Sequence, residues 1–156
     1  MNNAKRCTTA LVFGLMPLAA MATDACNPVG TWVVNVTAPP ETFIPPIVEL
    51  VSFMPGGVVL QTSSDLAKIT GQGAWTRRPN CRIEFKVLKH THDHTGLDFL
   101  GFIRTTVRAK IDGDSYSTEP GDYKSEFVFG MDPDAPPATS VAVSASAGKR
   151  LKARGT

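Results

Sequence analysis

A long run of alternating residues between Cys81 and Ile111 constrains the fold of this chain more than any other feature. Apolar residues recur at every second position on both sides of a short polar turn, residues 92–96, and charged residues fill many positions between them. A period of two places successive side chains on opposite faces of a strand, so the pattern predicts an antiparallel hairpin with one dry face and one wet face. The predicted dry face carries Cys81, Ile83, Phe85, Val87, Phe99, Gly101, Ile103, Thr105, Val107, Ala109 and Ile111.

Shorter strand-like segments lie on both sides of this hairpin, separated by proline, glycine and aspartate. Proline cannot donate to a sheet hydrogen bond and glycine permits the positive φ of tight turns, so these residues indicate where strands end. We predict an all-β fold, a single antiparallel eight-stranded up-and-down barrel, because closure also removes exposed strand edges. The other predicted strands are residues 29–37, 47–54, 58–62 and 71–77, one strand of residues 115–118 and 123–129 that is interrupted at 119–121, and residues 140–151.

The N-terminal segment resembles a targeting signal rather than part of the fold. Lys5 and Arg6 precede an apolar run, residues 10–20, and Ala20-Met21-Ala22 is a small-x-small cleavage pattern. We therefore predict a secretory signal peptide at residues 1–22 and one β-barrel domain at residues 23–156. An uncleaved N-terminal anchor is the alternative, although the run is short for a permanent membrane span. The predicted location is secreted or periplasmic, and after cleavage the protein is not an integral membrane protein.

Removal of the signal changes the charge and the cysteine count. The chain has 16 Lys and Arg against 14 Asp and Glu, and the loss of Lys5 and Arg6 leaves 14 of each sign. This balance gives no support for a nucleic-acid partner. Cys7 leaves with the signal, so Cys26 and Cys81 remain as an even pair in an oxidising compartment, which predicts a disulfide between them.

Two short motifs carry a family resemblance. Gly30-Thr31-Trp32 on the first strand and Gly148-Lys149-Arg150 on the last resemble the paired signature of lipocalins and their calycin relatives. The wider layout is similar to small bacterial lipocalin-like proteins through Ser52–Gly57, Gly71–Trp75 and Asp112–Ser117. The resemblance implies that Gly30, Trp32 and Arg150 form a structural signature, with the tryptophan at the closed end of a barrel and the arginine over it. Related barrels include cofactor-free cyclases.

The dry face supplies the candidate ligand-binding residues. An apolar pocket with a few polar groups is how small-ligand sites are built, and an eight-stranded barrel has room for one small ligand or for side chains alone. The predicted lining is Phe53, Trp75, Phe85, Phe99, Ile103, Tyr123, Phe127 and Glu49, with Thr105 as a further polar group.

Three functions fit this interior. The first is a barrel that binds a small apolar molecule. The second is a cofactor-free cyclase or isomerase in which Glu49 or Tyr123 polarises the substrate. The third is an interaction protein with a filled barrel and an exposed anchor at Phe43-Ile44.

The sequence nominates no catalytic residue and no cofactor. It contains no Gly-x-Ser-x-Gly elbow and no glycine-rich phosphate loop, so activity as an enzyme stays open. His90, His92 and His94 have the spacing of metal ligands on one strand face, and Asp98 could add an oxygen. The phase of the preceding strand instead places His90 on the wet face and the other two in the turn. We predict a solvated histidine turn and no metal.

Overall fold

The computed structural model describes residues 24–39, 45–64, 70–93, 95–96, 98–142 and 145–152. These residues form ten strands, and none of them lies in a helix. The strands are β1 (Gly30–Thr37), β2 (Ile47–Phe53), β3 (Val58–Ser63), β4 (Thr70–Arg78), β5 (Arg82–His92), β6 (Phe99–Asp112), β7 (Ser115–Ser117), β8 (Tyr123–Phe129), β9 (Thr139–Ala142) and β10 (Ala145–Arg150).

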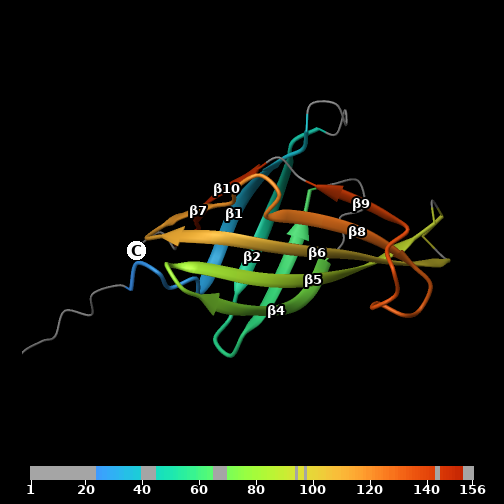
Figure 1. The fold of residues 1–156 in the computed structure, drawn as a ribbon, viewed down its shortest axis with the longest axis horizontal. Helices are drawn as coiled ribbons and strands as arrows, with labels where there is room; N and C mark the ends of the chain where they lie inside the picture. Colours follow the sequence, from blue (N-terminus) through green and yellow to red (C-terminus); the bar gives the residue numbers. More distant parts are fainter. Residues whose placement is uncertain are drawn as a thin grey trace, which may run out of the picture.

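The strands close into an antiparallel barrel with eight wall positions, which confirms the predicted fold class. β1 to β6 follow one another in order, and β10 returns to pair with β1. β7 and β8 pair with successive parts of β6, while β10 pairs with β7 and β9 with β8. β7 with β8, and β9 with β10, therefore each occupy one wall position. Figure 1 shows β5 and β6 crossing in front of β1 and β2.

Local chemistry explains the break between β7 and β8. Glu119-Pro120-Gly121 interrupts the alternation, and proline lacks the N–H that the ladder needs. Gly121 has a φ of 86°, which suits a turn but not a strand. The wall resumes at Tyr123, which pairs with Val107 of β6. β7 and β8 are thus two parts of one wall position, interrupted where the sequence predicted.

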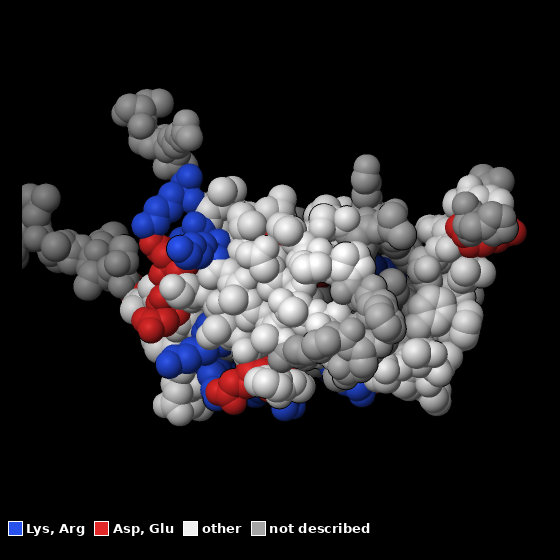
Figure 2. Space-filling model, turned by 90° about the horizontal axis from the view of Figure 1, so that it is seen from above, with Lys and Arg blue, Asp and Glu red and all other residues white. Residues whose placement is uncertain are grey.

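The closed end of the barrel is sealed by Trp32 and Arg150. These residues are register partners in the β1–β10 pair, and the Arg150 guanidinium carbon lies 4.5 Å from the centre of the fully buried Trp32 ring. The Trp32 Nε1–H donates to the Pro28 carbonyl over 2.8 Å. Arg150 also donates to the carbonyls of Val29 and Asn27 and pairs with Asp114, so it ties three segments together. Charged side chains gather toward this end of the molecule (Figure 2).

Cys26 and Cys81 form the predicted disulfide, with Cα atoms 4.7 Å apart. Cys81 lies in the β4–β5 turn, where Asn80 and Cys81 both have positive φ, at 61° and 58°. Two successive positive φ values are the signature of a type I′ hairpin turn. The disulfide therefore fastens the segment before β1 to a tight hairpin at the closed end.

The structure corrects the predicted position of Phe99. A bulge shifts the β5–β6 register, so that Thr91 faces Gly101 while His92 faces Phe99, and Leu100 is the extra residue. The extra residue reverses the alternation, because a slip of one position moves a side chain to the other face. The Phe99 ring consequently packs on the outer face, at 6.0 Å from His90 and 5.2 Å from Phe102. It does not line the interior.

His92 is also placed differently from the prediction. β5 continues to His92, so this residue belongs to the strand rather than to the turn, and its ring lies 6.1 Å from Phe99. His90 is exposed on the outer face, as the alternation predicted. His94, the predicted signal peptide and the Phe43-Ile44 anchor lie outside the described residues.

Candidate functional site

Four polar side chains from four strands meet inside the barrel. They are Glu49 of β2, Gln61 of β3, Lys89 of β5 and Tyr123 of β8. Each occupies an inward position of its strand, and each is at most 4% exposed. We call these four residues the polar layer. Polar groups at such depth are costly unless they find partners, so their contacts decide what the site can do.

Glu49 is the centre of the polar layer. The Tyr123 hydroxyl donates to Glu49 Oε1 over 2.8 Å, and Lys89 Nζ lies 3.6 Å from the same oxygen. Gln61 Nε2 donates to the Tyr123 oxygen over 3.5 Å, since the tyrosine proton is already directed at Glu49. Gln61 Oε1 is buried and has no hydrogen-bond partner among the described residues. The described side chains therefore satisfy the network only in part.

Tyr123 remains a proton donor over the physiological range. Burial raises its pKa well above the usual value, and the neighbouring Glu49 carboxylate raises the pKa further by charge repulsion and hydrogen bonding. The phenol therefore stays neutral and keeps its hydrogen bond to Glu49. Tyr116, which is also buried, has its pKa raised chiefly by burial.

Lys89 has donors to spare. Its ammonium makes an ion pair with Glu49 but no hydrogen bond within the part of the chain that the structure describes. An ammonium carries three N–H donors, so these remain for another acceptor. Gly71 on β4 leaves room for the lysine stem, because a Cβ added there would lie 2.8 Å from Lys89 Cγ. The stem therefore lies along the inner wall with its charge in the interior.

Above the polar layer, several inward side chains are half-buried. Most inward positions below the layer are buried, with Trp75 as an exception, whereas most of those toward the β5–β6 tip are half-buried. We call this half-buried ring the mouth. Its members are Ile47, Thr91, Ile103, Ser125 and Phe127.

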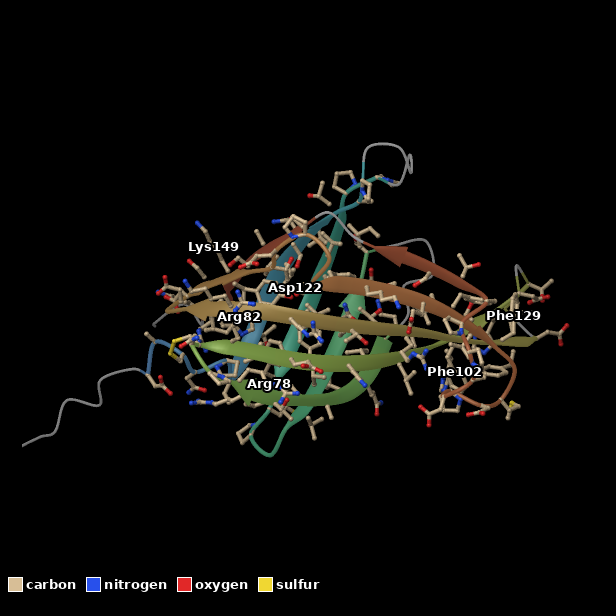
Figure 3. The ribbon with its side chains drawn as sticks, viewed as in Figure 1. Arg78, Arg82, Phe102, Asp122, Phe129 and Lys149 are labelled. Carbon is tan, nitrogen blue, oxygen red and sulfur yellow. A yellow bond between two sulfur atoms is a disulfide. The ribbon has the colours of Figure 1, made fainter. Side chains whose placement is uncertain are left out.

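The rim beside the mouth is apolar and exposed. Gly130 N donates to the Leu100 carbonyl over 3.0 Å, which brings the segment after β8 against the bulge in β6. Phe129 is 61% exposed and Met131 is 81% exposed. Figure 3 shows Phe102 and Phe129 together at this end, far from the labelled Lys149. Exposed apolar side chains therefore lie at this end of the barrel.

Below the polar layer, aromatic side chains form a packed floor. Phe53 and Phe85 are each 1% exposed, and their ring centroids are 5.2 Å apart in an edge-to-face arrangement. Trp75 packs edge-on to Phe53 at 5.9 Å, is half-buried, and donates from Nε1 to the Met54 carbonyl. These three predicted lining residues therefore support the site from beneath.

The predicted lining residues thus fall into four groups. Glu49 and Tyr123 belong to the polar layer, Ile103 and Phe127 to the mouth, Phe53, Trp75 and Phe85 to the floor, and Phe99 to the outer face.

Sequence reasoning missed Gln61 and Lys89. Lys89 follows Val87 by two positions and Gln61 follows Val59 by two, so the alternation places both side chains inside. The alternation along each strand could therefore have identified both residues as inward-facing. It did not, because lysine and glutamine usually lie at the surface.

Other parts of the described surface offer less. A groove of ≈ 420 Å³ crosses the outer face of β4, β5, β6 and β8, and two of its charged residues, Arg104 and Glu126, pair with each other over 2.8 Å. Within the described ranges, three or more His, Cys, Asp or Glu side chains nowhere come close enough together to hold a metal ion.

A comparison of the chain with models of protein families, with curated proteins and with solved structures found no match. In the described residues no helix has the length and hydropathy needed to cross a membrane. The closed barrel itself is consistent with a calycin-like architecture.

Proposed function

We propose that this protein is a secreted or periplasmic lipocalin-like barrel that binds a small, largely apolar molecule in its interior. The molecule enters at the mouth, and its inner end rests on the polar layer above the aromatic floor. The observation that carries the proposal is the partly satisfied polar layer, buried between a packed closed end and the half-buried side chains of the mouth. Small-ligand sites combine apolar walls with a few convergent polar groups in this way.

The location rests on two features. The Cys26–Cys81 disulfide fits an oxidising compartment, where such bonds persist. The first 22 residues have the composition of a signal peptide. Removal of that segment leaves a domain that begins just before the disulfide.

A cofactor-free cyclase or isomerase is the second candidate. The Tyr123–Glu49 hydrogen bond beside the Lys89 ammonium favours it, because a donor and a cation held in a dry site can polarise a substrate. This alternative needs the same interior site, so evidence for a bound ligand serves both candidates. Conversion of an extracted ligand by fresh protein, and loss of conversion in Tyr123→Phe, would separate catalysis from binding.

Titration with the neutral fluorescent probe N-phenylnaphthylamine tests the binding site. We expect saturable binding of one probe per chain. Ile103→Trp places a large side chain across the mouth, so it should weaken binding by about ten-fold or more, which corresponds to roughly 1.4 kcal/mol.

Thr106→Trp is the matched control, since Thr106 lies on the same strand but faces outward. It should bind the probe like the parent protein. Equal loss in both variants, or no loss in Ile103→Trp, would place the probe outside the barrel and contradict the proposal. A complete lack of probe binding would support the filled-barrel interaction protein.

A further inference from the structure

The polar layer also indicates which chemical class of ligand the barrel selects. We infer that the bound molecule is uncharged at its inner end and carries an oxygen there that accepts a hydrogen bond from Lys89, as an ester, a ketone or an alcohol does. This inference rests on the proposed function, and it adds a charge rule to it.

The charge rule follows from the Glu49–Lys89 pair. Of the residues that the structure describes, these two are the charged side chains that are buried. They have opposite charges, and Lys89 Nζ lies 3.6 Å from Glu49 Oε1, so the polar layer carries no net charge. A carboxylate ligand would add an uncompensated negative charge to this dry interior, and an ammonium ligand an uncompensated positive one. Isolated charges in such surroundings are strongly disfavoured.

The acceptor rule follows from the hydrogen bonds. The Tyr123 proton is used by Glu49, and the tyrosine oxygen already accepts from Gln61. Lys89 brings unused N–H donors into the layer, because its contact with Glu49 is an ion pair longer than a hydrogen bond, and the second N–H of Gln61 Nε2 is a further donor left unused by the described residues. An oxygen at the inner end of a ligand would use these donors without changing the charge.

Competition between matched fatty compounds tests the inference. Methyl decanoate, decanoate and decylammonium share an apolar chain and differ at the polar end, so each is titrated against bound N-phenylnaphthylamine near neutral pH. In the parent protein the neutral ester should displace the probe at about ten-fold lower concentration than either charged compound, or lower still.

Two single variants should reverse the preference. Glu49→Gln leaves the Lys89 cation unpaired, so decanoate should become a better competitor than the ester. Lys89→Met leaves the Glu49 carboxylate unpaired and removes the donors, so the ester should weaken and decylammonium should gain. In each variant, the ratio between the concentrations of ester and charged compound that displace the probe should change by about ten-fold or more.

If a single variant does not fold, the double variant Glu49→Leu with Lys89→Met can be measured in its place. It removes both charges, and it should still discriminate against both charged compounds. Parent protein that binds decanoate as well as the ester, while Ile103→Trp still blocks the probe, would overturn the inference and leave the proposed function intact. Probe binding that ignores Ile103→Trp would overturn both.

Discussion

Arg150 and Trp32 pack against each other at the closed end and are both held by hydrogen bonds to the backbone. The guanidinium covers the indole face at 4.5 Å and also donates to backbone carbonyls around it. The family resemblance led us to expect this stacking, and the antiparallel register of β1 and β10 accounts for it. Two residues 118 positions apart in the chain are neighbours because the barrel closes between them.

A double-mutant cycle measures this contact. We expect a coupling free energy of about 0.5–2 kcal/mol between Trp32→Phe and Arg150→Met in urea denaturation, which is the range of a buried cation–π contact. Arg150→Met alone should cost more than the coupling, because it also removes hydrogen bonds to backbone carbonyls. Arg78→Met is the control, since Arg78 is exposed and should show no coupling to Trp32. A coupling near zero in the first cycle would mean that the stacking does not contribute to stability.

Tyr116 and Tyr123 are the two tyrosines of the chain, and both are buried with raised pKa values. The near-ultraviolet absorbance of phenolate should therefore stay flat in the native protein as the pH rises through about 10, where unfolded tyrosine ionises. The unfolded state then releases protons that the folded state retains, so stability should fall as the pH rises above about 10. Protein unfolded in guanidinium is the control. Native ionisation near the ordinary pKa would contradict the burial of these side chains.

At the scale of elements, the disulfide links the segment before β1 to the β4–β5 turn. It closes a loop of 55 positions, for which the chain-entropy account gives about 4 kcal/mol. Cys26→Ser with Cys81→Ser should lower the free energy of unfolding by roughly this amount in non-reducing denaturation. Addition of dithiothreitol should lower the parent protein to the level of the double variant and leave the variant unchanged. Equal stability of both proteins without reductant would show that the bridge does not form.

β6 and β8 are joined on the outer face by Glu126, which contacts Lys124 and lies 2.8 Å from Arg104 Nε. The hydrogen bond from Lys124 and then that from Arg104 lower the pKa of Glu126. Because the pKa of Glu126 is lower in the folded state, the ionised carboxylate stabilises the fold. This stabilisation is fully present above the unfolded-state pKa of about 4.3 and is lost as the pH falls through the folded-state pKa.

Glu126→Gln should therefore be about 1 kcal/mol less stable than the parent near neutral pH, and this difference should shrink as the pH falls below about 4. Thermal unfolding at several pH values measures the difference. A stability difference between parent and variant that stays the same in acid would show that Glu126 stabilises the fold through packing and not through its charge.

The alternation predicted most elements because it depends on burial, which a barrel imposes on every strand. It failed at Phe99, where one extra residue in β6 reverses the phase without breaking the apolar pattern. Gly101, with a φ of 155°, permits the close approach there, since an added Cβ would lie 2.0 Å from the Val128 carbonyl oxygen. No local feature of the sequence distinguishes this glycine from an ordinary strand position.

For the whole molecule, the closed architecture could be predicted but the content of the interior could not. The alternation of residues and the turn residues predict each strand separately. The polar layer, in contrast, is formed by four strands that come together only in the closed barrel. Glu49 and Tyr123, for example, are 74 positions apart, and only closure places them 2.8 Å from each other. Inward phase identified Glu49 and Tyr123 as polar candidates, but their connection to Lys89 required the three-dimensional structure.

Mass spectrometry of small molecules extracted from the purified native protein tests the central claim most directly, because it requires no assumed ligand. The account predicts an extracted molecule that is neutral and mainly apolar, present at about one per chain, and absent from Ile103→Trp purified in the same way. A molecule recovered equally from Thr106→Trp would support the interior position. Recovery of an anionic lipid from the parent would contradict the charge rule, and equal recovery from Ile103→Trp would contradict the claim that the barrel interior is the binding site.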